Sequence, residues 1–182
     1  LLGLYQMKYP FDIYRSIRAT GSLRLDRFLQ LSTENNSFLS PAVNEKRVSL
    51  KLEYIFDNTY DAAMNIKHGT RYKIYVEAIN QFDMQVIDGF SFDPSLGFTG
   101  IIGFDARHYI PVLSKSVLAI RAAGATSIGS QKMLYYLGGM ENWLLPKFDN
   151  SIPVPDDADF AYKANAFQLR GFDNNIRNGG TY

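Results

Sequence analysis

Side chains that could bind a metal ion are few in this sequence. The two histidines, His68 and His108, are expected on a turn and near a strand end, and their spacing does not suggest a shared metal. There is no cysteine, so disulfides and thiolate metal sites are excluded. The acidic residues Asp156, Asp157 and Asp159 lack the glycine turn and the bidentate glutamate of a recognised calcium-binding loop.

Nucleotide-binding and hydrolase motifs are also missing. The segment GATSIGS follows an expected strand, but it neither opens a helix nor supplies a phosphate-binding lysine. No arrangement of serine, histidine and aspartate can be argued from the spacing. We therefore expect no enzyme activity, no metal, no cofactor and no small-molecule substrate.

The segment LRGF, Leu169 to Phe172, has residue types suited to docking in a polar environment. Gly171 permits backbone conformations that other residues resist. Arg170 has five fixed donors that suit a carboxylate, and Phe172 supplies an anchoring ring. A loop with these residues can be held in a polar lumen, although the same residues also fit a surface turn. The candidate carboxylate partners within the chain are Glu53, Glu77 and Asp105.

The composition narrows the partner classes. Of 182 residues, 46% are hydrophobic, 20% are charged and 14% are aromatic. The net charge of +1 gives no long-range field that would attract nucleic acid, so no nucleic-acid partner is expected. No signal peptide opens the sequence, and no run approaches the ~20 apolar residues of a membrane helix. The chain begins with LLGLYQ instead of Met, so we interpret it as a fragment or a processed form.

Apolar and polar residues alternate with period two along much of the chain, which is typical of β-strands. In the segment 48–56, for example, every second residue is apolar, and Ser49, Lys51 and Glu53 lie between them. About six strands of roughly 9 to 14 residues are expected, longer than the usual ~5 to 6 residues. Their approximate ranges are 1–8, 11–31, 48–57, 71–81, 97–110 and 117–128, and a long loop is expected over 129–182.

Long strands with one apolar face fit two architectures. In a soluble β-sandwich or a lipocalin-like binding domain the apolar side chains point inward, against another sheet. In an outer-membrane β-barrel they face lipid, and the charged side chains line the lumen. The side chains that distinguish these alternatives are Leu50, Leu52, Ile74, Val76, Ile102 and Phe104.

Three features favour the membrane barrel. The polar faces carry charges of both signs, which can pair inside a lumen. The connections near Pro10, at 58–70 and near Pro111 fall at one end, whereas 32–47, 82–96 and the longest segment, 129–182, fall at the other, as in barrels with short turns on one side. Aromatic residues also gather near expected strand ends, where rings can lie at lipid headgroups: Phe11, Tyr14, Tyr54, Phe56, Tyr72, Phe82, Phe104 and Tyr109.

The segments KMLYYLGG, which ends in Gly138 and Gly139, and LRGF together resemble the BamA/TamA superfamily, the bacterial surface-antigen barrels. The order YP, YIFDNT, GTRYKIYVEA, RHYIPV and VLAIRAAGATSIG is similar to the strands of that family. The resemblance implies an extracellular loop that folds into the barrel, with Arg170 contacting the inner wall. More narrowly, the chain resembles the C-terminal barrel of envelope proteins with a TolB-like propeller, and no propeller is contained in these residues.

One departure from the family pattern is the spacing of these motifs. The family places the glycine pair a few residues before the Arg-Gly pair, whereas here residues 140–168 intervene. We interpret this insert as a surface cap or a partner-binding lobe. The 182 residues contain no POTRA repeat, so the resemblance supports the fold more directly than it supports client insertion.

The sequence thus predicts an all-β protein, an antiparallel transmembrane β-barrel segment in which residues 1–182 are part of one domain and further strands lie outside them. The resemblance implies the outer membrane of a Gram-negative bacterium, contact with outer-membrane lipid and with other envelope proteins, and a role in protein assembly, translocation or surface-complex formation. The alternatives are a soluble β-sandwich or lipocalin-like binding domain and a passive channel.

Overall fold

The computed structural model describes residues 1–28, 43–64, 66–85, 91–113, 116–139, 153, 160–169, 172 and 175–182. Within these residues the chain is all-β, with ten strands and no helix. The strands of the main sheet pair in antiparallel fashion, so the expected all-β antiparallel class is confirmed. The described residues contain no helix that could cross a membrane.

The large sheet is a meander in which each long strand pairs with the next long strand along the chain. The exception in sequence order is the short β4 (Tyr60–Ala63), which pairs only with the beginning of β5. The long strands follow the spatial order β1 (Leu2–Pro10), β2 (Arg15–Phe28), β3 (Val43–Asp57), β5 (Ile66–Gln85), β6 (Ser91–Leu113) and β7 (Ser116–Gly129).

Each expected strand range contains a strand, but several bounds differ. The expected strand over 11–31 begins only at Arg15, because Asp12 Oδ1 accepts hydrogen bonds from the backbone N–H groups of Tyr14 and Arg15, both at 2.7 Å, and closes a turn. Strands β5 and β6 extend beyond 71–81 and 97–110 at both ends. At the end near Gln85 and Ser91, backbone pairing resumes past a register shift between Gln81 and Asp83. The alternation of apolar and polar residues is lost at the register shift, so the sequence pattern underestimates the lengths of both strands.

A second, three-stranded sheet lies within the segment expected to be a loop. It has the order β10 (Arg177–Gly179), β8 (Lys132–Gly139), β9 (Phe160–Leu169). We call these strands, with residues 180–182, the lobe. Strands β8 and β9 are parallel, and parallel neighbours need a crossover of about a dozen or more residues. The residues between β8 and β9, 140–159, are numerous enough for such a crossover.

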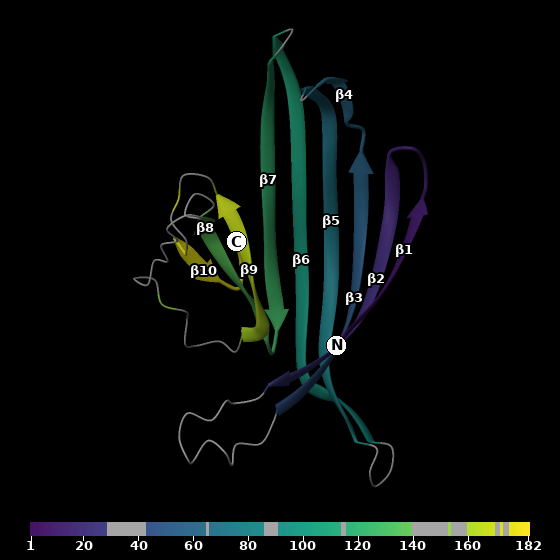
Figure 1. Cartoon of the computed structure of the whole chain (residues 1–182), viewed down its shortest axis with the longest axis vertical. Helices are drawn as coiled ribbons and strands as arrows, with labels where there is room; N and C mark the ends of the chain where they lie inside the picture. Colours follow the sequence, from purple (N-terminus) through teal and green to yellow (C-terminus); the bar gives the residue numbers. More distant parts are fainter. Residues whose placement is uncertain are drawn as a thin grey trace.

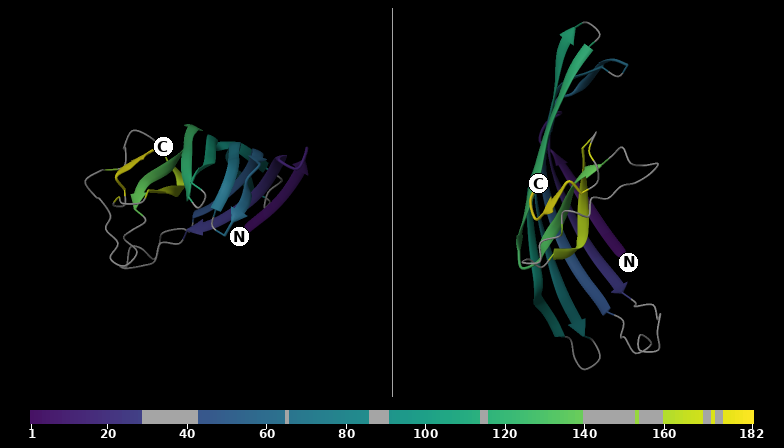
Figure 2. Two further views of the ribbon diagram at one scale, coloured as in Figure 1. Left: turned by 90° about the horizontal axis from the view of Figure 1, so that it is seen from above. Right: turned by 90° about the vertical axis from the view of Figure 1, so that its left-hand side faces the viewer.

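The large sheet is twisted and curved, and the lobe lies on one side of it, beside β7 (Figures 1 and 2). The turn between β1 and β2, the short β4 and the far ends of β6 and β7 share one end of the sheet (Figure 1). Strands β2, β5 and β7 end at the opposite end, as the antiparallel order requires. The lobe therefore begins at the end of the sheet where β7 stops.

Candidate functional site: the polar face and the lobe

The two faces of the large sheet differ in chemistry. Because side chains alternate along a strand, the cross-strand register places Lys51 beside Thr20 and Glu77, and Glu53 beside Arg18 and Tyr75. Asp105 pairs with Lys73 and so shares this face. We call it the polar face. The three carboxylates expected to line it, Glu53, Glu77 and Asp105, therefore do so together.

Glu53 is the most enclosed of these carboxylates, with a side chain only 6% exposed. Its Oε2 lies 3.4 Å from Arg18 Nη1, and its Oε1 lies 3.7 Å from Lys51 Nζ and 3.6 Å from Lys73 Nζ. Lys51 Nζ also lies 4.0 Å from Glu77 Oε2. Strands β2, β3 and β5 are thus tied together by charge in the middle of the polar face.

Asp105 forms a second centre on β6. Arg107 contacts it through Nε at 3.2 Å and Nη2 at 3.3 Å, and Arg121 on β7 contacts it through Nη2 at 2.8 Å and Nε at 3.4 Å. Each arginine presents two donors to one carboxylate, the geometry that suits a guanidinium fork. The carboxylate is thereby fixed between β6 and β7.

Toward the end where β7 stops, the polar face becomes apolar and receives the lobe. Ile79, Ile101 and Ala125 are buried there against Met133 and Tyr135 of β8. Tyr135 is 2% exposed and Met133 is 3% exposed, so this contact excludes water almost completely. The beginning of the segment 129–182 thus packs on the face opposite the apolar one, and an inward fold into a barrel lumen stays a prediction.

Buried hydroxyl groups fix the start of the lobe to the sheet. Ser127 Oγ accepts a hydrogen bond from the Met133 backbone N–H at 3.0 Å, and it lies 3.1 Å from the Met133 carbonyl and 3.0 Å from the Gly180 carbonyl, either of which can accept its proton. Thr99 Oγ1 donates to the Gln131 carbonyl at 2.5 Å. Ser127 and Thr99 are both buried on the polar face. Met133 and Gly180 of the lobe satisfy Ser127, and Gln131, just before the lobe, satisfies Thr99.

Tyr75 lies between the group of charged side chains around Glu53 and the lobe. Lys51 Nζ stands 4.6 Å from the centre of its ring, and Lys73 Nζ stands 5.6 Å from it, both within the range of a cation–π contact. The ring covers Gly103, where a Cβ atom would collide with it. Tyr75 also hydrogen bonds with Tyr182, whose ring packs on Tyr135 with centroids 4.9 Å apart.

The last described residues return to the edge of β7. Tyr182 N–H donates to the Ala125 carbonyl at 3.0 Å, Ala125 N–H donates to the Tyr182 carbonyl at 3.3 Å, and Ser127 N–H donates to the Gly180 carbonyl at 2.9 Å. Thr126 and Thr181 are bridged in antiparallel register. The lobe is thus held to β7 at its beginning and at its end.

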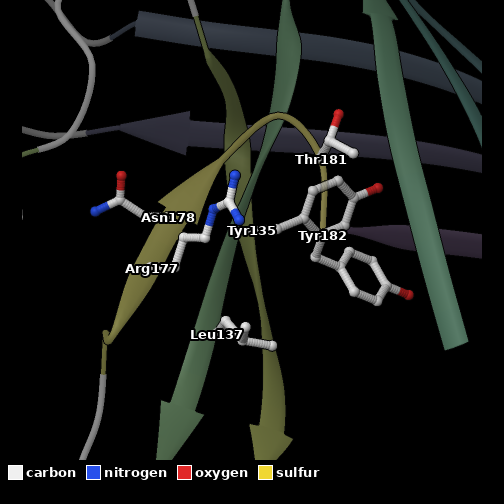
Figure 3. Close-up of a pocket in the computed structure, with 6 residues that line it drawn as sticks. All are labelled: Tyr135, Leu137, Arg177, Asn178, Thr181 and Tyr182. Carbon is white, nitrogen blue, oxygen red and sulfur yellow. The ribbon is translucent and has the colours of Figure 1, made fainter. Parts of the chain in front are cut away.

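A pocket of about 190 Å³ opens at this end of the lobe (Figure 3). Arg177 and Asn178 of β10 lie on one side of it, and the rings of Tyr135 and Tyr182, which pack at a tilt, lie on the other (Figure 3). Burial raises the pKa of the Tyr135 hydroxyl above the usual tyrosine value, and the charges of Tyr75 and Glu77 raise it further. Burial also raises the pKa of Tyr182, with its hydrogen bond to Tyr75 as the next cause.

The motif residues are brought together across β8 and β9. Gly138 pairs with Gln168 and Gly139 pairs with Leu169, so the glycine pair lies directly beside the start of LRGF in spite of the insert. Gly138 has a φ of 141°, which favours glycine. Leu169 and Phe172 are exposed, 37% and 50% respectively. Arg170 and Gly171 lie outside the described residues, so the contact expected between Arg170 and a carboxylate of the polar face stays a prediction.

Other sequence expectations have mixed outcomes. His68 was expected on a turn but lies in β5, where its Nδ1 is 3.3 Å from the Tyr60 hydroxyl. His108 Nδ1 is 2.8 Å from Thr70 Oγ1 on the neighbouring strand. Within the described part of the chain no group of three or more potential ligands could hold a metal. Asp156, Asp157 and Asp159 lie outside that part.

Sequence reasoning missed the residues that seat the lobe, namely Ser127, Thr99, Met133 and Tyr135. The available signal was the loss of charge from the polar-facing positions Ile79, Ile101 and Ala125, which marks a place where that face needs an apolar cover. Comparisons of the chain with protein-family models, with curated proteins and with solved structures found no match. The BamA/TamA resemblance therefore stays a prediction from the motifs.

Proposed function

We propose that this chain is part of the wall of an outer-membrane β-barrel of the BamA/TamA type, from a Gram-negative bacterium, and that it serves protein assembly, translocation or a surface complex. The observation that carries the proposal is the exposed apolar face of the large sheet. Its six distinguishing side chains are all exposed, namely Leu50 56%, Leu52 45%, Ile74 51%, Val76 45%, Ile102 49% and Phe104 45%.

The height of this apolar face suits a bilayer. Along β3 it runs from Val48 to Phe56, and the register aligns this segment with residues 72–80 of β5, where Asn80 is the polar residue at the border. A membrane-crossing β-strand uses about 9 to 11 residues when it is tilted by about 45°, and each segment has about that length. Lipid therefore provides a natural partner for the apolar side chains.

Aromatic rings follow one boundary of the apolar face. Phe56 stacks on Tyr72 with ring centroids 5.0 Å apart, and Tyr14 packs on Phe56 at 6.5 Å. Tyr9 and Phe11 continue the row at 5.4 Å. Aromatic rows at the boundary of an apolar face are typical of membrane–water interfaces. Of the other aromatics expected at a boundary, Phe82 is buried and Tyr109 shares the polar face with Asp105, so neither belongs to this row.

The soluble sandwich or lipocalin-like alternative requires the apolar side chains to be covered by another sheet. The lobe covers the opposite, polar face instead, and no described strand covers Leu52 or Val76, which are both exposed. A large exposed apolar face in water would promote aggregation. The membrane proposal accounts for this face and the soluble alternative does not.

The assembly role draws on the strand edges and the lobe. Among the described strands β1 pairs only with β2, and β7 has Gly180 to Tyr182 beside only part of its outer edge. Unpaired strand edges are templates for the addition of another strand. The lobe covers part of the polar face, where a passive channel would need free space. We propose that an edge pairs with a client or partner strand while the lobe stays seated.

Lipid contact is tested by attaching an environment-sensitive fluorophore to Val76→Cys in protein folded into vesicles. The matched control is Glu77→Cys, the next residue on the same strand, which faces the opposite side. We expect blue-shifted emission and quenching by brominated lipid at residue 76 and neither effect at residue 77. A folded, monodisperse monomer in plain water, with residue 76 insensitive to brominated lipid, contradicts the proposal.

The assembly role and the position of Arg170 need separate tests. Depletion of the protein from a bacterium that encodes it should lower the amounts of other outer-membrane barrel proteins, whereas normal amounts together with a steady ion conductance in planar bilayers would favour a passive channel. Arg170→Cys should form a disulfide with Glu77→Cys on the polar face and not with Val76→Cys on the other. Cross-linking to neither position rejects the inward placement of Arg170.

A further inference from the structure

A small pocket surrounded by basic side chains opens on the polar face, on the side of the charged centre away from the core of the lobe. It has a volume of about 140 Å³. Arg18 of β2, Arg71 and Lys73 of β5 and Arg107 of β6 line it, together with Ile55 and Asp105. We call it the basic pocket. Four positively charged side chains from three strands therefore converge on a space lined by one carboxylate.

Three arginines stand side by side next to this pocket. The register pairs Arg71 directly with Arg107, and Arg107 directly with Arg121. Like charges at directly opposed positions of an antiparallel sheet destabilise it. A row of three arginines therefore needs negative charge nearby to compensate it. Residues that destabilise the local structure in this way are often found at functional sites.

The carboxylates on this face compensate the row only in part. Glu53 is shared by Arg18 and Lys73, Asp57 contacts Arg71 at 3.4 Å, and Asp105 is shared by Arg107 and Arg121. Five positive side chains thus share three negative ones. Adding the contacts of Lys51 with Glu53 and Glu77 brings one charge of each sign and leaves the excess unchanged.

Glu53 and Asp105 lie deeper than the basic groups around the pocket. The side chains of Glu53 and Asp105 are 6% and 16% exposed, whereas those of Arg71, Lys73 and Arg107 are 57%, 41% and 42% exposed. The Arg71 Nε lies 3.4 Å from Asp57 Oδ2, and among the described residues the Arg71 guanidinium makes no side-chain hydrogen bond. Donors therefore remain on the open side of the pocket.

We propose that the basic pocket binds a soluble phosphate-type oxyanion, such as a phosphate or diphosphate group. Guanidinium forks match the oxygens of such a group in bidentate fashion, and two or three converging arginines suit a multiply charged anion better than a single carboxylate. A lipid headgroup carries the same chemistry. The pocket lies on the face opposite the exposed apolar one, which favours a soluble ligand.

The test is calorimetric titration of the protein with inorganic pyrophosphate, in a maltoside detergent free of phosphate. We expect one ion to bind per chain, more weakly as salt is raised. Arg71→Gln should weaken binding at least about tenfold, because it removes charge-assisted hydrogen bonds. Arg107→Lys keeps the charge but loses the fork, and it should weaken binding less than Arg107→Gln does.

The matched control is Arg15→Gln, which removes the same charge at the turn between β1 and β2, where Arg15 pairs with Asp12. It should leave pyrophosphate binding unchanged. Absence of binding to the unmodified protein, or equal weakening by Arg15→Gln and Arg71→Gln, overturns the proposal. If the protein binds phosphatidate in mixed micelles but not pyrophosphate, the ligand is a lipid headgroup, and the proposal of a soluble ligand is wrong. Arg71 is exposed at the rim, so its substitution is compatible with folding, and circular dichroism checks this.

Discussion

Glu53 shows how one side chain on the polar face holds three strands. It is 5% exposed as a residue and lies within ion-pair distance of Arg18, Lys51 and Lys73. Glu53→Gln removes the charge and keeps the shape, leaving three basic groups without their shared partner. We expect a loss of about 1–3 kcal/mol in the free energy of unfolding, measured by urea titration.

The exposed pair of Lys67 and Asp61 is the control for that measurement. Its atoms are 2.8 Å apart, closer than any contact of Glu53, but the side chains are 51% and 68% exposed. Water screens such a pair, so Asp61→Asn should leave the free energy of unfolding unchanged within error. If both variants lose the same free energy of unfolding, burial does not explain the contribution of Glu53 to stability.

Gly103 is the residue on which the position of Tyr75 depends. An added Cβ atom would collide with the tyrosine ring and hydroxyl, whereas nothing lies within 4 Å of the corresponding position at Gly21. Gly103→Ala should displace the ring from Lys51 and from Tyr182, and thereby loosen the lobe. Limited proteolysis should cut its lobe faster than that of Gly21→Ala. Equal resistance of the two variants would show that Tyr75 adapts without disturbing the lobe.

At the level of elements, the lobe is seated through neutral tyrosines. The pKa values of Tyr135 and Tyr182 are raised in the folded protein, so the folded state holds these protons more tightly than the unfolded state. Their contribution to stability is complete below the ordinary tyrosine pKa of about 10 and falls as pH rises above it. We expect the lobe to become more susceptible to hydrogen exchange above about pH 10.

Replacement of both tyrosines separates this effect from the general rise of amide exchange with hydroxide concentration. In a protein carrying Tyr135→Phe and Tyr182→Phe, the alkaline increase in exchange within the lobe should be reduced. An undiminished increase in that protein would show that Tyr135 and Tyr182 are not its cause.

The elements also show what alternation in a sequence can and cannot predict. Val48 to Phe56 alternates cleanly, and both the strand and its exposed apolar face were predictable from it. β9 pairs in parallel with β8 across a long crossover, and nothing local in the segment FAYKANAFQL specifies that partner. Glu53, Glu77 and Asp105 were predictable as one face because the period of a strand is two, whereas Ser127 depends on contacts with a distant segment.

For the whole molecule, we expect the cost of placing an arginine on the exposed apolar face to depend on its depth in the bilayer. Ile102 lies midway along the apolar part of β6, and Ala106 lies on the same face near the aromatic row, opposite Tyr72. Ile102→Arg should cost about 2–4 kcal/mol of folding free energy in a lipid bilayer, and Ala106→Arg only about 0–1 kcal/mol. Urea titrations in vesicles measure both, and equal costs would contradict a bilayer centred on Ile102.

Because residues 180–182 pair with β7, the length of the connection between β8 and β9 can vary without moving the ends of the lobe. The lobe is anchored at Ser127 near its start and at Ala125 near its end, so its two attachment points are neighbours whatever lies between them. Doubling a flexible connection adds only about 0.6 kcal/mol of closure entropy. Evolution can therefore lengthen, shorten or decorate the crossover at small thermodynamic cost, and a reporter peptide inserted there should leave the anchored strands in place.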